Sequence, residues 1–109
     1  MKKETNEKIS IINKEFQLLE YFMNKQTVNG NIVIDSISTL DMTMKNSSSY
    51  TGTINGDNTA KNIKLKLDKS SKIKLTGNSY VTSLDNADSS NSNIDFNGYK
   101  LYVNGKAIN

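Results

Sequence analysis

The sequence contains no cysteine, histidine, arginine, tryptophan or proline in its 109 residues. Without cysteine, neither disulfides nor thiolate metal sites contribute to stability or function. Without histidine and arginine, the chain lacks the usual general base, the commonest imidazole metal ligand and the bidentate clamp for anions. No apolar run approaches the roughly 18 residues that span a bilayer. The N-terminal residues MKKETNEKIS lack the apolar core of a signal peptide. Two interpretations stay open: a mature chain without its leader, or a protein that remains inside the cell.

What the chain has instead is polarity with little net charge. Asparagine, serine and threonine occur 16, 13 and 9 times, and the formal net charge is +3. A charge of this size does not by itself indicate a nucleic-acid partner. The length suits one domain with a modest core, or a piece of a larger one.

Residues 6–25 have the spacing of an amphipathic helix. Asn6 suits the N-cap and Lys25 suits the last turn. Apolar residues recur every three or four positions and would share one face: Ile9, Ile12, Phe16, Leu19 and Met23. We expect residues 1–26 to form an N-terminal amphipathic cap. A helix that binds a partner or a membrane surface is the alternative.

After Gly30 the apolar period changes to two, which is typical of half-buried strands. Short segments of this kind occur at residues 32–34, 40–44, 63–67, 73–75 and 99–103. Asn-Gly pairs and serine clusters separate them and favour turns with positive φ. Residues 27–109 are therefore predicted to be mainly β.

An internal repeat suggests how these strands are arranged. MTMKNSSSYTG (42–52) and LKLDKSSKIKL (65–75) superimpose at an offset of 23 residues, which aligns Met42 with Leu65 and Tyr50 with Ile73. This period suits one coil of a parallel β-solenoid, whose strands stack about 4.8 Å apart. An antiparallel sandwich or barrel of hairpins is the competing arrangement. In a solenoid the N-terminal helix would cover the exposed strand edges at one end.

The C-terminal three-quarters resembles the last coils of secreted bacterial carbohydrate-binding β-helix proteins, which are non-catalytic and pectate-lyase-like. The similarity covers roughly residues 27–106, and its most specific segments are SYTGTIN, LTGNSYVTSL and SNIDFNGYKLYVNG. The resemblance implies a short right-handed parallel β-helix, an extracellular or cell-surface location, and calcium sites. It also implies binding of cellulose-like or acidic plant polysaccharides.

A row of lysines alternates with the apolar residues of the repeat and is predicted to face outward: Lys64, Lys66, Lys72 and Lys74. Ammonium groups about 7 Å apart along a strand (two residues of ~3.3 Å each) match carboxylates spaced along a uronic-acid chain. The plainer interpretation is that these lysines keep strand faces soluble and discourage edge pairing. A nucleic-acid platform would favour arginine and exposed aromatic residues, and arginine is absent.

Aromatic residues are relevant because neutral sugars stack on exposed rings. Tyr102 shares the outward register with Lys100 and is the best stacking candidate. Tyr50 and Tyr99 occupy inward positions and are expected in the core, whereas the position of Tyr80 is ambiguous.

Oxygen ligands for calcium are concentrated in LDNADSSNSN (84–93), which holds Asp85 and Asp88, with Asp95 following. Loops of this composition are usually only solvated turns. Catalysis is not expected: enzymes of the lyase fold typically use arginine for proton removal, and a lysine would need burial to replace it.

The sequence therefore favours a non-catalytic carbohydrate-binding or adhesin-like module that needs no cofactor, with calcium as an optional ligand. Its partner would be a polysaccharide rather than nucleic acid, and no membrane span is expected. The alternative is a structural unit that forms homo-oligomers by associating end to end through the ends of the coil.

Overall fold

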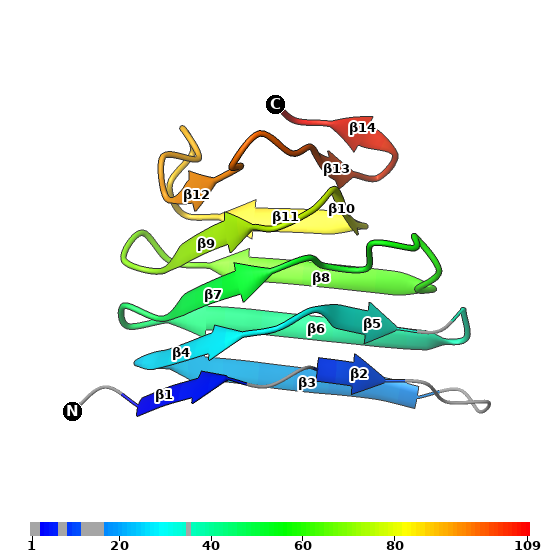
Figure 1. The fold of residues 1–109 in the computed structure, drawn as a ribbon, viewed down its shortest axis with the longest axis horizontal. Helices are drawn as coiled ribbons and strands as arrows, with labels where there is room; N and C mark the ends of the chain where they lie inside the picture. Colours follow the sequence, from blue (N-terminus) through cyan, green and yellow to red (C-terminus); the bar gives the residue numbers. More distant parts are fainter. Residues whose placement is uncertain (1–2, 7–8, 12–16, 35) are drawn as a thin grey trace.

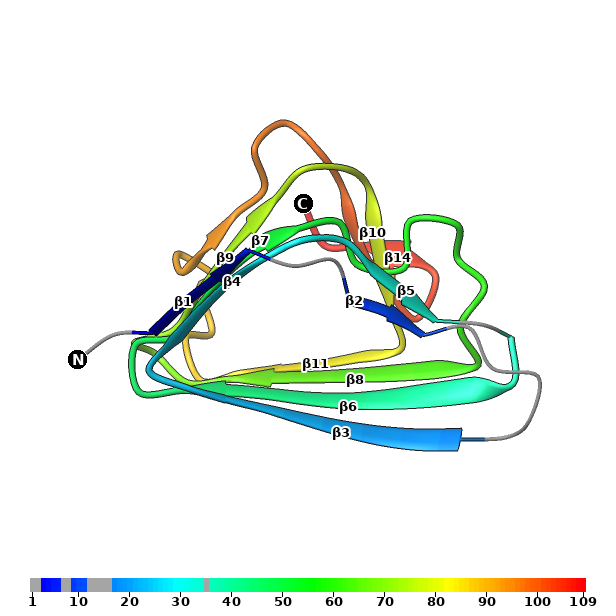
Figure 2. The same ribbon diagram turned by 60° about the horizontal axis from the view of Figure 1, so that its bottom comes forward.

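The chain forms a parallel β-solenoid of about four turns in the computed structural model (Figure 1). The structure describes residues 3–6, 9–11, 17–34 and 36–109. Strands of successive turns pair in register, so the coil has sheets on three sides, and Figure 2 shows the roughly triangular outline that results. The expectation of stacked short strands is confirmed.

Each side of the coil has its own set of strands. Sheet 1 contains, in spatial order, β1 (Lys3–Asn6), β4 (Gln26–Asn29), β7 (Ser49–Gly52), β9 (Lys72–Leu75) and β12 (Ile94–Asp95). Sheet 2 contains β3 (Gln17–Asn24), β6 (Ser38–Lys45), β8 (Asn62–Leu67) and β11 (Ser83–Asn86). The third side contains β2 (Ile9–Ile11) with β5 (Ile32–Ile34), and β10 (Ser79–Val81) with β13 (Leu101–Val103) and β14 (Lys106–Ala107).

The predicted offset of 23 residues is the register of the central coils. Met42 pairs with Leu65 in sheet 2, and Tyr50 pairs with Ile73 in sheet 1. All of these strand pairs are parallel, and β13–β14 is the one antiparallel pair among the described strands. The hairpin alternative is thus limited to the last turn, where Asn104 and Gly105 both have positive φ, as a tight two-residue hairpin requires.

Inward-facing residues form apolar columns along the coil axis. In sheet 1 the column has exposures of at most 5% and consists of Val28, Tyr50, Ile73 and Ile94. In sheet 2, Met42 stacks on Leu65, and Met44 stacks on Leu67. Full burial of a side chain of this size contributes about 1.5–3 kcal/mol. The columns therefore supply most of the driving force for stacking.

The predicted N-terminal capping helix is not supported. Within residues 6–25, Ile9–Ile11 and Gln17–Asn24 are strands, and β3 pairs with β6 along its whole length. Lys25, expected in the last helical turn, has a φ of 53° in the turn between β3 and β4. Residues 7–8 and 12–16, which include two positions of the expected helical stripe, lie outside the described residues.

The helix prediction was wrong because the apolar residues of β3 fit both the helical period and the strand period of two. Met23 is fully buried while its neighbour Phe22 is 59% exposed, which is strand alternation. In this register Tyr21 extends the column of Met42, and Met23 extends that of Met44. Tertiary pairing of this kind routinely overrides helical propensity.

A close backbone approach lies where β7 ends. The buried Tyr50 hydroxyl donates a hydrogen bond of 2.6 Å to the carbonyl oxygen of Gly30, and burial raises the pKa of the Tyr50 phenol. A Cβ atom on Gly52 would overlap both that carbonyl oxygen and the Tyr50 hydroxyl. Glycine is required at residue 52 because no side chain fits between adjacent coils.

We predict that Gly52→Ala destabilises the fold by about 2 kcal/mol or more, since backbone must shift to admit the methyl group. Urea unfolding followed by circular dichroism measures this loss. The control is Gly56→Ala, whose Cβ would contact only the Thr53 methyl at 3.0 Å and the Asn78 carbonyl oxygen at 3.9 Å. Equal stability of the two variants would show that the close approach at Gly52 does not constrain the coil.

Candidate functional site

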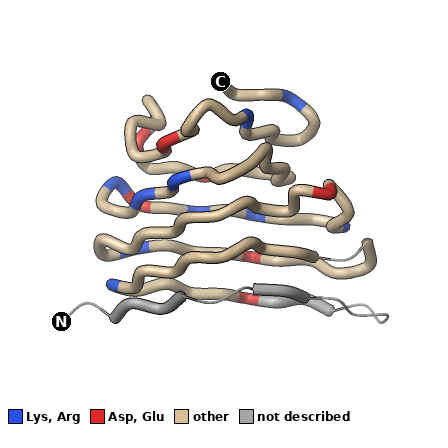
Figure 3. The backbone as a smooth tube through the Cα atoms, in the orientation of Figure 1, with Lys and Arg blue, Asp and Glu red and all other residues tan. Residues whose placement is uncertain are grey.

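The four lysines of the repeat are exposed, as the alternation predicts, but they lie on two sides of the coil. Lys64 and Lys66 are on β8 in sheet 2, whereas Lys72 and Lys74 are on β9 in sheet 1. Figure 3 shows lysine positions gathered where β8 turns into β9. The lysines therefore do not form one flat face.

The other two predicted contact residues lie on the third side. Tyr102 is in β13, and Lys100 comes immediately before this strand. The six predicted carbohydrate-binding residues are thus distributed over three sides, and no single flat ligand can touch them all.

On sheet 2 the lysines have acidic neighbours in paired positions. Asp41 is in register with Lys64, and Asp85 is in register with Lys66. Opposite charges on adjacent strands contribute about 0.2–1 kcal/mol per pair. Glu20 lies in register with Asp41 and adds further negative charge. The outer surface of sheet 2 is therefore balanced in charge, which fits the plainer role of solubility.

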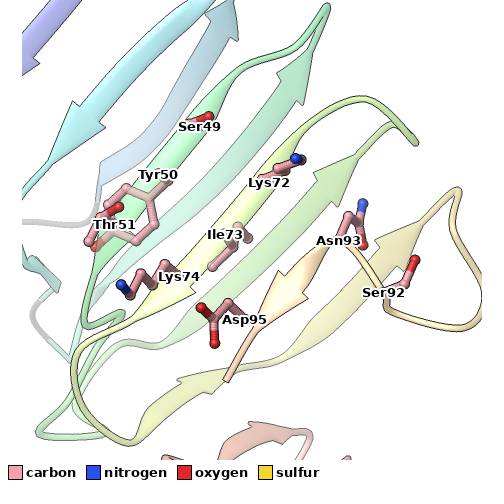
Figure 4. A pocket seen from close by; sticks show the side chains of 9 residues that line it. All are labelled: Ser49, Tyr50, Thr51, Lys72, Ile73, Lys74, Ser92, Asn93 and Asp95. Carbon is pink, nitrogen blue, oxygen red and sulfur yellow. The ribbon is translucent and has the colours of Figure 1, made fainter. Parts of the chain in front are cut away.

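Sheet 2 carries a hollow of about 330 Å³, in which Lys45 and Lys66 lie together with the carboxylates of Asp68 and Asp85. The outer surface of sheet 1 carries a shallow groove of about 310 Å³ that runs across the strands (Figure 4). The floor of the groove is formed at Tyr50 and Ile73, whose side chains point into the core.

One wall of the groove consists of Ser49 and Lys72 and ends at Ser92 and Asn93, and the opposite wall consists of Thr51, Lys74 and Asp95. Asn93 is buried, and its amide makes hydrogen bonds with Asn86 and with the Asp68 carbonyl oxygen. Each wall is a column of residues from successive coils, so the groove follows the coil axis.

The two lysines of the groove differ in their surroundings. Lys74 is flanked in register by Thr51 and Asp95, so one of its two neighbours along the wall is a carboxylate. Lys72 is in register with Ser49, and no acidic residue is paired with it among the described strands. Lys72 is consequently the lysine of the repeat with the weakest competition from a protein carboxylate.

A tight turn at residues 68–71, the corner, connects β8 with its lysines to β9 at the groove. The Asp68 carboxylate accepts hydrogen bonds from the backbone N–H groups of Asn46 at 2.9 Å, Ser70 at 3.0 Å and Ser71 at 2.9 Å. The Ser70 hydroxyl donates a further bond of 2.8 Å. Burial alone would raise the pKa of Asp68, but these hydrogen bonds outweigh it and hold the pKa below its ordinary value. The corner thereby fixes the start of β9 and its lysines.

The three aspartates predicted to bind calcium are not brought together. Asp85 lies beside Lys66 and Asp95 beside Lys74. The Asp88 carboxylate accepts hydrogen bonds from the hydroxyls of Ser90 and Ser92, which lower its pKa. Within the described ranges, no group of three or more histidine, cysteine, aspartate or glutamate residues could hold a metal ion. Calcium binding stays a prediction.

The tyrosines follow the sequence prediction in part. Tyr50 is buried as expected, but Tyr99 is 38% exposed, so its assignment to the core is wrong. The reason is that Tyr99 precedes β13, where the alternation has not begun. The ring of Tyr102 stacks on that of Tyr80, with centroids 4.8 Å apart and planes within 8°.

Part of the groove could have been found from the repeat. Ser49 and Thr51 stand 23 residues before Lys72 and Lys74, so the offset already places them side by side. Asn93 could not be placed in this way because the register between β9 and β12 shortens to 21 residues, from Ile73 to Ile94.

Comparisons of the chain with family models, curated proteins and solved structures give no match. The resemblance to carbohydrate-binding β-helix proteins therefore stays a prediction from the sequence, together with the extracellular location that it implies. Over the part of the chain that the structure describes, no helix has the length and apolar character needed to cross a membrane. Evidence for function comes from the surface chemistry of this chain.

We predict that Asp68→Asn destabilises the protein by about 1 kcal/mol or less at pH 7, because the corner loses a charged acceptor that is screened by solvent. Because folding lowers the pKa of the Asp68 carboxyl, this group stabilises the folded state at pH values above its ordinary pKa of 3.8. The stabilisation is lost as the pH falls through the pKa of the folded state. The difference in unfolding free energy between wild type and variant should therefore shrink below about pH 4.

Urea unfolding at a series of pH values measures this difference. Asp57→Asn, in an exposed loop, controls for the loss of one negative charge. A difference that is independent of pH would contradict the role assigned to the Asp68 carboxylate.

Proposed function

We propose that this chain is a non-catalytic binding module for an acidic polysaccharide, and that the ligand lies in the groove of sheet 1. The observation that carries the proposal is the pair of exposed lysines, Lys72 and Lys74, on opposite walls of a groove that also carries the hydroxyl groups of Ser49 and Thr51. Such a lining offers ammonium groups to carboxylates and hydrogen-bonding partners to sugar hydroxyls.

The groove favours an extended ligand that runs along the coil axis. Its walls are columns with a repeat of about 4.8 Å, and the two walls are about 7 Å apart because Lys72 and Lys74 are two residues apart on one strand. A carboxylate on the chain would lie between the two ammonium groups. The open shape lets a polymer enter sideways and continue beyond both ends of the groove.

Affinity in such a site comes from several weak contacts. An exposed ion pair contributes less than about 1 kcal/mol and is screened by salt. Binding should therefore be weak for single sugars and stronger for polymers, and it should fall as ionic strength rises. The same openness favours binding over catalysis, since nothing encloses a reacting group in the groove.

The proposal predicts that Lys72→Gln with Lys74→Gln weakens binding to polygalacturonate by roughly tenfold, the sum of two exposed contacts. Affinity gel electrophoresis measures the retardation of each protein, corrected by its mobility without the polysaccharide. Lys64→Gln with Lys66→Gln is the matched control, because both double variants lower the net charge from +3 to +1. Equal retardation of the two double variants would reject the groove as the binding site.

The carboxylate of Asp95 supplies a test in the opposite direction. Because Asp95 lies in register with Lys74 on one wall, its negative charge repels an acidic ligand that approaches the groove. Asp95→Asn should strengthen binding to polygalacturonate by about two- to threefold at low salt, and the gain should vanish at high salt. Asp85→Asn, beside Lys66 on sheet 2, makes the same change in charge away from the groove. A gain of the same size there would reduce the Asp95 effect to net charge alone.

A further inference from the structure

The stacked tyrosines of the third side form the start of an aromatic column. Tyr80 belongs to β10 and Tyr102 to the adjacent β13, and these residues pair in register. Their ring centroids are 4.8 Å apart and their planes differ by 8°. This spacing equals the distance between neighbouring strands. Each ring therefore presents its flat faces along the coil axis.

The column stops at the next strand because its third position is an alanine. In the antiparallel β13–β14 pair, Tyr102 is directly opposite Ala107, and directly paired residues project from the same side of a sheet. Ala107 is exposed and presents only a methyl group. Tyr80 therefore covers one face of the Tyr102 ring. The other face borders a step in the surface above Ala107, where a methyl group stands in place of a third ring.

The last residues hold this step in place. The Asn109 side chain accepts a hydrogen bond from the Leu101 N–H at 3.0 Å and donates one to the Tyr99 carbonyl at 2.7 Å. Lys100, two residues before Tyr102, donates from its ammonium group to the Asn109 main-chain oxygen at 2.9 Å. Lys106 precedes Ala107 on β14 and, by strand alternation, projects from the opposite side of the sheet. Because the Lys100 charge is engaged and Lys106 points away, the step is better suited to a neutral ligand than to an anion.

We infer that the step between Tyr102 and Ala107 is a ring-stacking site for one pyranose unit of a neutral, β-linked polysaccharide. A pyranose with equatorial substituents has a flat face of C–H groups, whose partial positive charge matches the negative face of an aromatic ring. A sugar above Ala107 would continue the stack of Tyr80 and Tyr102 at the same spacing. The platform is already ordered by stacking and pairing, so little conformational freedom is lost on binding. This site lies on a different side of the coil from the lysine groove and does not depend on it.

Titration with cellohexaose, followed by NMR of the tyrosine ring protons, tests the inference. Saturable shifts are expected for Tyr102. Ala107→Leu fills the step with an apolar side chain and should weaken binding about fivefold or more. Ala107→Ser keeps the step open and should bind like the wild type. Tyr102→Ala should also lose binding, and the thermal melting curve of each variant checks that it remains folded.

Two results would overturn the inference. One is wild-type Tyr102 resonances that do not shift with millimolar cellohexaose, and the other is equal affinity of Ala107→Leu and Ala107→Ser. Retardation of the same variants on polygalacturonate separates this site from the lysine groove. If Ala107→Leu keeps its retardation but loses cellohexaose, the two sites are independent. If wild type binds cellohexaose but not polygalacturonate, the stacking site stands and the acidic-ligand proposal fails.

Discussion

The structure depends on one constraint, which is that each strand must lie in parallel register about 4.8 Å from the strand one coil earlier. In that geometry a residue is always covered by its counterpart from the next coil, so columns of similar side chains are required inside. The column of Val28, Tyr50 and Ile73 meets this requirement with apolar side chains that are almost completely buried. Gly52 shows how strict the spacing is, because a single methyl group there would overlap the neighbouring coil.

The same constraint leaves the outward positions free to differ, and the three sides of the coil use this freedom differently. Sheet 2 alternates acidic and basic residues between strands, as with Asp41 and Lys64, and its charges largely compensate one another. Sheet 1 combines lysines with hydroxyl groups around an open groove. The third side carries an aromatic stack that stops at Ala107. A rigid coil thus presents distinct chemistries on surfaces that are fixed relative to one another.

The sequence predicted those features that depend on the repeat, and it failed where the repeat is absent or ambiguous. The pairing of Met42 with Leu65 and the outward lysines followed from a period of 23 and an alternation of two. The segment Gln17–Asn24 was assigned to a helix because its apolar residues satisfy both periods, and only pairing with β6 decides between them. The groove was not predicted, although the repeat already aligns Ser49 with Lys72; Asn93 enters through a shorter register. The repeat also implies that β8 and β9, which lie within one coil of 23 residues, belong to different sides, and the prediction of a single lysine row did not take this into account.

The separation of the lysines onto two sides changes how binding to a polymer would work. A continuous flat strip of cations would bind any polyanion, with affinity set by charge alone. Here Lys72 and Lys74 line a groove whose walls limit how a chain lies, so shape contributes beside charge. Because the sheet beneath is already ordered by stacking, binding costs the protein little conformational entropy. Weak contacts on such a surface become useful through repetition along the ligand: a long polysaccharide that dissociates from one contact remains held by the others. A stacked coil with modest, open sites is therefore physically better suited to holding an extended polymer than to enclosing a small molecule.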